Sequence, residues 1–382
     1  MSLALLGLGT AQPAHAIDQQ TMAASAEPCS CATDKQRKLL PALYRRTRVD
    51  RRHSVIVNAT NGEAKLPLTE RMLAFYPPAS DEADRGPALS ERMRRYPEEA
   101  LPLAAEACRN ALEDADITPD QISQLVVVSC TGFSAPGVDI GLIDTLGLPA
   151  TVGRTVVGFM GCHGAMNGLR VARALADSLT NPDEHVLMCC VELCTLHFQY
   201  GWDPQKVVAN ALFADGAAAI VGRPLNDLPP GLSDSSTPLL AKLPGVAAHG
   251  SRLLPDSRDL MTWIIRDHGF EMTLSPKVPD LIREHLRGWL EPWLAEQGLD
   301  ISQVQGWAIH PGGPRVISSV EQALDLFAGA GDPSRQVLRD YGNMSSPTVL
   351  FILDQLRQAN TLRPWVALAF GPGLTIEATL IR

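Results

Sequence analysis

Buried, strand-like runs alternate with helical patterns along most of the chain, and this alternation restricts the fold more than any other feature. Residues 124–130 and 185–191 are predicted as fully buried strands, because apolar side chains fill both of their faces. A strand without a polar face must be covered on both sides of its sheet. The pattern therefore predicts an α/β fold in which helices cover a largely buried sheet.

The second half of the chain repeats the style of the first, which indicates an internal duplication. In each half a buried strand, a tight polar turn and a buried helix follow one another. A stretch rich in Pro, Ser, Asp and Gly at 224–238 predicts a crossover between the halves. Two units are therefore expected, one at 1–235 and one at 236–382.

Composition limits the class of protein. The 382 residues carry a formal net charge of -9, and 45% of them are hydrophobic. A sizeable core is expected, and nucleic acid is not the expected partner, because phosphate binding needs a basic face. No run approaches the roughly 18 apolar residues of a membrane span. The apolar run 2–9 precedes Ala14-His15-Ala16, which resembles a signal-peptidase site, but it lacks a basic flank, so a first strand and turn are expected there.

The chain has eight cysteines, and four of them, Cys130, Cys189, Cys190 and Cys194, lie in or beside apolar runs. This placement is typical of reduced thiols in an intracellular protein, so a cytoplasmic location is expected. The spacing of Cys29-Ser30-Cys31 is too short for an ordinary zinc pair, and no matching His/Cys pair accompanies it. No metal site is therefore expected.

One cysteine, Cys162, is bracketed by glycines between the short strand pattern at 155–158 and a helical pattern that begins at Gly164. This layout places a thiol on a tight turn at a helix N-terminus, where the partial positive charge of the helix end favours the thiolate. Cys162 is therefore a candidate nucleophile. The alternative is a buried thiol that serves only as a small apolar side chain.

Two further polar turns end apolar strands, His310-Pro311-Gly312-Gly313-Pro314 and Tyr341-Gly342-Asn343-Met344-Ser345-Ser346-Pro347. Loops at strand ends of α/β folds collect catalytic groups. A thiolate, an imidazole and an amide suit nucleophilic catalysis in which an oxyanion is stabilised by hydrogen bonds. Cys162, His310 and Asn343 are therefore the predicted catalytic residues. His163 adjoins Cys162, but neighbouring helical residues do not face each other, so it is the less favoured partner.

A basic stretch lies between Gln36 and Arg52. Most such runs are solvated helix faces. The alternative is a site for the phosphates of a nucleotide-like cofactor, with Arg45, Arg46 and Arg48 as the candidate contacts.

Several segments together resemble the signatures of the chalcone synthase-like type III polyketide synthases, which belong to the thiolase superfamily. They are Gly161-Cys162 with its helix, the two polar turns, Phe370-Gly371-Pro372-Gly373-Leu374-Thr375 and Leu212-Phe213-Ala214-Asp215-Gly216-Ala217-Ala218. The segments occur in the family's order, and the resemblance covers nearly the whole chain. Initiating ketoacyl-carrier-protein synthases share the Cys-His-Asn set but lack the Phe-Gly-Pro-Gly loop.

This resemblance implies a duplicated five-layer αβαβα fold of the thiolase type that works as a homodimer. It implies that Cys162 takes an acyl starter from a coenzyme A thioester. It further implies that His310 and Asn343 bind the thioester carbonyl of malonyl-CoA and stabilise the enolate formed on loss of carbon dioxide. Coenzyme A thioesters are then substrates, and no cofactor is bound permanently. Phe213 is the implied gatekeeper between the coenzyme tunnel and the reaction cavity.

The resemblance also places side chains at the substrate, and some depart from the plant enzymes. Met272 occupies the second gatekeeper position, where the plant enzymes have phenylalanine, and methionine allows a wider passage. Cys130, Cys194 and His197 stand where the plant enzymes have threonines. Arg46 aligns with one of the basic residues that bind coenzyme A, and the others have no basic counterpart. The implied substrate contacts are Phe213, Met272, Cys130, Thr131, Cys194, His197, Ser345, Gly371 and Pro372.

The leading hypothesis is a type III polyketide synthase that extends a fatty acyl-CoA starter with malonyl-CoA. The extended chain would cyclise to an alkylpyrone, an alkylresorcinol or a related phenolic, since small residues at the cavity wall leave room for an alkyl chain. Three alternatives remain open. They are a synthase that uses only malonyl-CoA and forms a tetrahydroxynaphthalene-type product, a carrier-protein-dependent ketoacyl synthase, and a non-catalytic dimer of the same fold.

Overall fold

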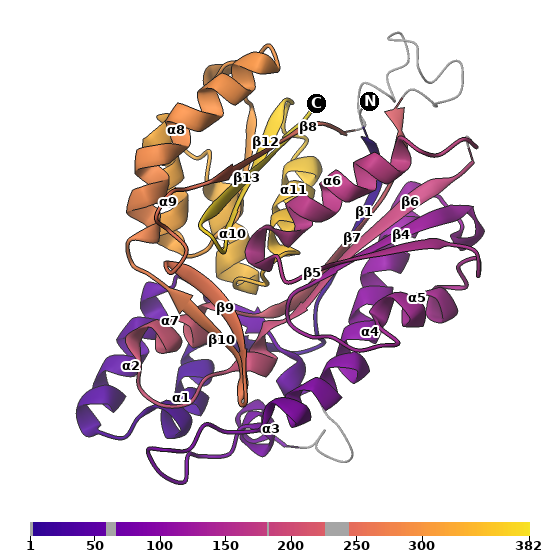
Figure 1. Ribbon diagram of the computed structural model, residues 1–382. Helices are drawn as coiled ribbons and strands as arrows, with labels where there is room; N and C mark the ends of the chain where they lie inside the picture. The colour runs from indigo at the N-terminus through magenta and orange to yellow at the C-terminus, as the bar shows by residue number, and fades with distance from the viewer. Residues whose placement is uncertain (1–2, 59–65, 182, 226–243) are drawn as a thin grey trace.

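The computed structural model describes residues 3–58, 66–181, 183–225 and 244–382. Strands and helices alternate along it, so the predicted α/β class is confirmed (Figure 1). The strands are β1 (Leu3–Ala11), β2 (Ala16–Asp18), β3 (Arg51–His53), β4 (Ile122–Ser129), β5 (Gly153–Gly158), β6 (His185–Leu193), β7 (Asp215–Pro224), β8 (Gly245–Leu253), β9 (Met261–Arg266), β10 (Gly269–Leu274), β11 (Gly306–Ile309), β12 (Trp365–Gly371) and β13 (Thr375–Ile381). The α-helices are α1 (Gln19–Ser30), α2 (Asp34–Arg46), α3 (Leu68–Phe75), α4 (Leu89–Ala115), α5 (Val138–Leu146), α6 (Gly164–Ala176), α7 (Pro204–Leu212), α8 (Val278–Glu296), α9 (Pro314–Leu324), α10 (Asp332–Tyr341) and α11 (Thr348–Gln358).

Within the described residues, nine strands form one sheet in the order β11-β12-β13-β8-β1-β7-β6-β4-β5. The sheet has two segments, which meet only where Leu3 and Ala4 of β1 pair with Val246 and Gly245 of β8. When the strands are numbered by chain order within each segment, the first segment runs 3-2-4-5-1. The second segment lacks a counterpart of the third strand; when its strands take the numbers of their counterparts in the first segment, it runs 2-4-5-1, which is the same order without strand 3. The two segments also match in strand direction, because strands 2 and 4 pair parallel and strands 4 and 5 pair antiparallel in both.

Helices lie between and outside the two sheet segments, so the expected five layers are present (Figure 1). Apolar faces of α6 and α11 pack together with both segments in one buried cluster. The outer face of the first segment is covered by α4 and α5, and that of the second by α8 and α9. The position of α6 and α11 in the central layer explains their broad apolar faces, which are built from small residues and Leu in α6 and from Val, Leu and Ile in α11.

Two sequence predictions concern the chain outside these layers. The apolar N-terminal run is a strand, β1, as expected. The predicted crossover at 224–238 falls largely outside the described residues, which stop at 225 and resume at 244, so the boundary between residues 235 and 236 stays a prediction. No helix in the described part of the chain is long and apolar enough to cross a membrane.

Candidate active site

Cys162 lies on the turn that joins β5 to α6. Phe159 and Gly161 have positive φ angles of 61° and 66°, and a short 3-10 turn, η4 (Gly161–His163), brings the chain into the helix. Gly161 is required at this turn for a second reason, because a Cβ there would lie 2.9 Å from Cδ of Pro372. Cys162 itself is buried. The glycine bracket seen in the sequence therefore lets the loop after β12 approach the thiol closely.

His310 follows β11 directly, and its backbone N–H donates to the carbonyl of Leu368 on β12, at 2.8 Å. The side chain is fully buried, and neither ring nitrogen makes a hydrogen bond with a described residue. Burial, with a smaller contribution from His163, lowers the pKa of His310 to about 3. The imidazole is therefore neutral at neutral pH, with one nitrogen free to accept a proton and the other free to donate one.

Asn343 lies in the turn between α10 and α11 and is fixed by its backbone. Its N–H donates to the carbonyl of Leu212 and its carbonyl accepts from Ala214 N–H, each at 2.9 Å, on either side of Phe213. The side-chain oxygen accepts from Ser345 N–H at 2.8 Å. The amide nitrogen Nδ2 is buried and makes no hydrogen bond with a described residue. The amide is thus held by its oxygen and leaves its N–H groups available.

The environment of Cys162 differs from the sequence prediction in one respect. The helix N-terminus was expected to favour the thiolate, but burial raises the pKa of Cys162 to about 11, and the charge of Glu192 acts in the same direction. The nearby side chains of Ser345 and Asn343 lower the pKa without reversing this shift. Desolvation therefore outweighs the helix end, and the resting group is a thiol that needs a base.

Three buried nitrogens without a partner, Nδ1 and Nε2 of His310 and Nδ2 of Asn343, belong to the predicted catalytic residues. Buried polar groups in proteins are nearly always hydrogen-bonded, so unsatisfied groups point to a ligand. Buried donors suit an oxygen that becomes negative during a reaction, because they need no reorganisation. The arrangement can activate a thiol and stabilise an oxyanion.

One cavity brings together most of the predicted substrate contacts. It is lined by Cys162 and by Cys130, Thr131, Cys194, His197, Phe213, Met272, Ser345 and Pro372. Gly371 does not line it and instead lies against His163, where a Cβ would be 2.1 Å from the ring. The His163 ring therefore packs between the turn that holds Cys162 and the loop after β12.

His197 lines the cavity but has no free nitrogen for a substrate. Its Nδ1 accepts from Phe270 N–H at 3.0 Å, and its Nε2 donates to the carbonyl of Thr131 at 2.7 Å. The ring stacks on Phe270 with centroids 4.2 Å apart. Burial lowers the pKa of His197 to about 3, so it presents a neutral, apolar face to the cavity.

Sequence reasoning missed Glu192, a buried carboxylate at the end of β6. It accepts hydrogen bonds from Cys130 N–H at 2.9 Å, the Thr131 hydroxyl at 2.7 Å and the Ser346 hydroxyl at 2.6 Å. Burial raises its pKa. The sequence offered one indication of Glu192, because this carboxylate follows a run of apolar residues. A glutamate in such a position is rarely buried unless it has hydrogen-bonding or charged partners.

The cavity also has a wall that the sequence did not reveal. Met22, Ile56, Met72, Tyr76 and Phe198 line it in addition to the predicted residues. They come from α1, α3 and the short turns η1 (Val55–Val57) and η5 (Cys194–His197) or the residues beside them, and carry no motif. Only the folded chain brings these separate segments to the same cavity.

The predicted arginines lie at surface hollows beside the cavity. Arg46 and Arg315 flank one hollow, whose apolar lining includes Leu212, the residue before the cavity-lining Phe213. A second hollow meets the first at Pro314 and Arg315 and is lined by Arg48, Arg335 and Arg339. Arg45 is exposed and lines neither hollow.

Comparison with known proteins agrees with this geometry. Residues 2–224 match the family model of the N-terminal domain of chalcone and stilbene synthases, and residues 246–382 match that of the C-terminal domain. The chain is 32% identical over 379 residues to "Alpha-pyrone synthesis polyketide synthase-like Pks18" of Mycobacterium tuberculosis, covering 98% of this chain and 89% of that protein. It is 39% identical over 287 residues to the 1,3,6,8-tetrahydroxynaphthalene synthase of Streptomyces peucetius subsp. caesius, covering 74% and 73%. The crystal structure of PKS-I from the brown alga Ectocarpus siliculosus superposes with a TM-score of 0.88 at 30% identity, covering 100% of this chain and 98% of that one.

Proposed function

Because this chain belongs to the chalcone and stilbene synthase family and is a type III polyketide synthase, we propose that Cys162 carries the growing acyl chain and that His310 and Asn343 generate the malonyl enolate. The observation that carries this assignment is the set of buried nitrogens without a partner on His310 and Asn343, of which the Asn343 side chain acts directly on the Cys162 thiol. In loading, neutral His310 accepts the thiol proton as Cys162 Sγ attacks the starter thioester. The bond to coenzyme A breaks, and the departing sulfur takes the proton from His310.

Extension then uses the same donors. As malonyl-CoA loses carbon dioxide, the electrons of the broken C–C bond form an enolate, whose oxygen accepts hydrogen bonds from Asn343 Nδ2 and an N–H of His310. The enolate carbon attacks the acyl carbon on Cys162. A new C–C bond forms, Cys162 leaves as a thiolate, and the longer chain returns to it for the next round.

For the starter we propose a fatty acyl-CoA. The apolar part of the cavity wall supports this choice of starter. Met22, Ile56 and Met72 line the same cavity as the small side chains of Cys130 and Cys194. Methionine side chains adapt to an alkyl chain and offer it no polar partner. The named product of the mycobacterial relative, an alpha-pyrone, is consistent with this proposal. The relative from Streptomyces supports the alternative, a naphthalene-type product from malonyl-CoA alone.

Met72→Trp, which fills the apolar wall, tests the starter. We expect kcat/KM for a twelve-carbon acyl-CoA to fall about tenfold or more, and that for a six-carbon acyl-CoA to change by less than about threefold. Met72→Leu keeps the volume and is the matched control. Starter consumption by liquid chromatography is the measurement. A large aromatic product from malonyl-CoA alone, with no added starter, contradicts the fatty acyl assignment.

We propose that Arg46 and Arg48 bind the phosphates of coenzyme A, with Arg315 and Arg339 beside them and Arg45 at the edge of the site. Arg45, Arg46 and Arg48 make no ion pair with a described residue. The apolar hollow at Arg46 ends at Leu212, next to Phe213, which suits a pantetheine arm that reaches past a gatekeeper.

The double variant Arg46→Ala/Arg48→Ala is expected to raise KM for malonyl-CoA about tenfold or more, since each lost charge-assisted contact removes roughly 1.5–3 kcal/mol. Activity with malonyl-N-acetylcysteamine, which lacks phosphates, should stay within about twofold of the parent enzyme. An equal loss of activity with malonyl-CoA and with malonyl-N-acetylcysteamine would contradict the assignment of these arginines to the phosphates. Faster loading from acyl carrier protein than from coenzyme A would instead favour the carrier-dependent hypothesis.

We further propose a homodimer and a cytoplasmic location. At the sheet edge formed by β5, the exposed fractions of Val156 (53%), Phe133 (44%) and Met160 (40%) are high for apolar side chains. An apolar edge strand of this kind is a template for pairing with a second copy. Sedimentation should give about twice the chain mass of 41.2 kDa. The eight unpaired cysteines suit a reducing compartment, which cell fractionation would test.

A further inference from the structure

Two short turns lie side by side in the cavity wall, and one buried carboxylate joins them. The turn η1 (Val55–Val57) contributes Ser54 and Ile56 to the wall, and η5 (Cys194–His197) contributes Cys194, Thr195 and His197. Asp215, the first residue of β7, is fully buried and does not line the cavity. Its position relative to the two turns suggests a role in holding them together.

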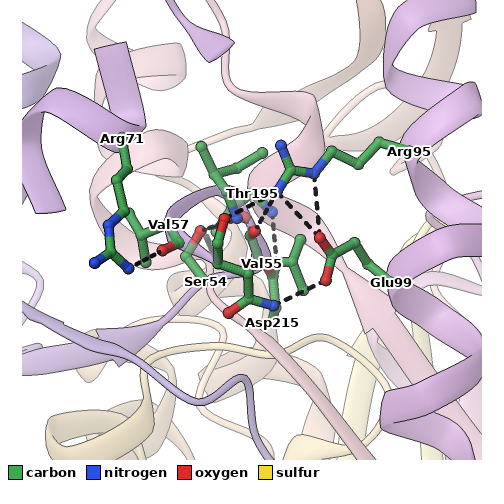
Figure 2. A network of polar contacts seen from close by, with 10 residues as sticks. Ser54, Val55, Val57, Arg71, Arg95, Glu99, Thr195 and Asp215 are labelled. Atoms are coloured by element: carbon green, nitrogen blue, oxygen red, sulfur yellow. Dashed lines mark hydrogen bonds and ion pairs between the residues drawn. The ribbon is translucent and has the colours of Figure 1, made fainter. Parts of the chain in front are cut away.

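Asp215 accepts hydrogen bonds from both turns (Figure 2). Val55 N–H donates to Oδ2 at 2.8 Å, and Thr195 N–H donates to Oδ1 at 2.8 Å. The Thr195 hydroxyl also donates to Oδ2, and it lies 2.8 Å from the hydroxyl of Ser54. Because each carboxylate oxygen binds a backbone N–H from a different turn, moving either turn breaks a hydrogen bond to a buried charge.

Other charged side chains fix η1 from its far side (Figure 2). Arg95 of α4 donates to the carbonyl of Val55 at 3.0 Å and is paired with Glu99 at 3.0 Å. Arg71 of α3 donates to the carbonyl of Val57 at 3.1 Å. With its carbonyls held by α3 and α4, η1 has little freedom to relax. The turn η5 is held as well, because the Tyr76 hydroxyl donates to the carbonyl of Thr195 at 2.9 Å and Arg92 donates to that of Leu196 at 2.8 Å. Asp215 therefore fixes the junction between two turns that are each held from elsewhere.

We propose that Asp215 is a positioning residue that holds η1 and η5 together in the cavity wall, and that the shape of the wall at this junction selects the length of acyl chain that the enzyme accepts. The proposal rests on the proposed function, because the shape of this wall matters only if an acyl chain lies against it. Burial raises the pKa of Asp215 to about 7, and the hydrogen bonds from Thr195 and Val55 oppose this shift. Burying the Asp215 carboxylate lowers the stability of the folded chain, as expected for a charged group that is kept because it positions its neighbours.

The test uses Asp215→Asn and Thr195→Val, with Thr195→Ser as the matched control. Asparagine keeps the size of Asp215 but offers one acceptor oxygen where the site presents three donors. Valine removes only the hydroxyl link, and serine restores it. The readout is the ratio of kcat/KM for twelve-carbon and six-carbon acyl-CoA starters, measured beside carbon dioxide release from malonyl-CoA.

We expect the starter ratio to change at least about fivefold in Asp215→Asn and Thr195→Val and to stay within about twofold in Thr195→Ser. Thr195 itself lines the cavity, so the starter ratio in Thr195→Val is judged against that in Thr195→Ser, which alters the same position but keeps the hydroxyl. An unchanged ratio in Thr195→Val overturns the proposal even if Asp215→Asn fails to fold. Loss of carbon dioxide release in Thr195→Val overturns it too, because the role would then be at the enolate.

Failure of the proposed function would look different. If the parent enzyme accepts malonyl-CoA as its only starter, the fatty acyl assignment fails, and the same variants are compared by the ratio of pentaketide to shorter products. A shift of that ratio in Asp215→Asn and Thr195→Val, absent from Thr195→Ser, upholds the positioning role. An unchanged ratio overturns it.

Discussion

Replacing Cys162 with alanine is expected to reduce chain-extended product by about a thousandfold or more, while malonyl-CoA still loses carbon dioxide. Without Sγ no acyl-enzyme forms, and removal of a nucleophile costs at least this much in enzymes that use covalent catalysis. His310 and Asn343 keep their backbone positions on β11 and beside Phe213, so the enolate site survives. Product formation and carbon dioxide release, measured in the same reaction, separate the two steps.

Cys130 and Cys194 are the matched controls, because their thiols line the same cavity. Burial raises the pKa of each well above the ordinary range. Cys130→Ser and Cys194→Ser should therefore retain product formation within about tenfold, and intact-protein mass spectrometry should still find one acyl group per chain. An acyl adduct that persists in Cys162→Ala, or disappears in Cys130→Ser, would assign the nucleophile to another thiol.

Two of the three predicted catalytic residues could be placed from sequence because each follows a strand whose apolar pattern is local. Cys162 follows β5 and His310 follows β11, and both strand patterns are visible within ten residues of sequence. The prediction that the turn at Asn343 also ends an apolar strand is wrong, because this turn comes directly after α10. The backbone of Asn343 instead forms an isolated parallel bridge with Phe213, which is a property of the folded chain.

The electrostatics of Cys162 could not be predicted in the same way. The helix N-terminus is a local feature, but the burial that raises the thiol pKa depends on segments far away in sequence, such as the loop after β12, whose Pro372 lies against Gly161. The apolar wall has the same origin, since Met22 and Met72 meet the site only after α1 and α3 have packed on η1. The periodicity and spacing of residues in a sequence describe one helix or strand at a time. The desolvation of a titratable group depends on all the helices, strands and loops that pack around it.

Glu192 and Asp215 illustrate an intermediate case. Glu192 lies near the C-terminal end of β6, and Asp215 is the first residue of β7. Each is a carboxylate beside a run of apolar residues, which makes it unusual in the sequence. The sequence pattern does not show which hydrogen-bond donors contact each carboxylate. Glu192 binds the turn after β4, and Asp215 binds η1 and η5. A buried carboxylate among apolar residues is a recognisable signal of a polar anchor, and its partners are a property of the fold.

Removing either enolate donor is expected to have the second largest effect. Asn343→Ala should slow carbon dioxide release from malonyl-CoA about a hundredfold to a thousandfold, the usual loss for one donor in an oxyanion site. His310→Ala should lose at least as much and should also slow acylation of Cys162, because the neutral imidazole accepts the thiol proton in the proposed mechanism. His310→Gln keeps one N–H donor without a usable base. It should therefore retain more carbon dioxide release than His310→Ala but acylate Cys162 no faster.

His163→Ala is the matched control for His310, since both imidazoles are buried beside the thiol's turn. His163 Nδ1 lies 2.7 Å from Asn167 Oδ1, and its ring packs on Gly371, so it supports the turn without reaching the substrate. Its charge lowers the pKa of His310, so its removal should raise that pKa and move the acidic limb of the rate profile upward in pH. Carbon dioxide release at neutral pH should stay within about tenfold of the parent. If His163→Ala abolishes release while His310→Ala does not, His163 is the enolate donor and the assignment of His310 is wrong.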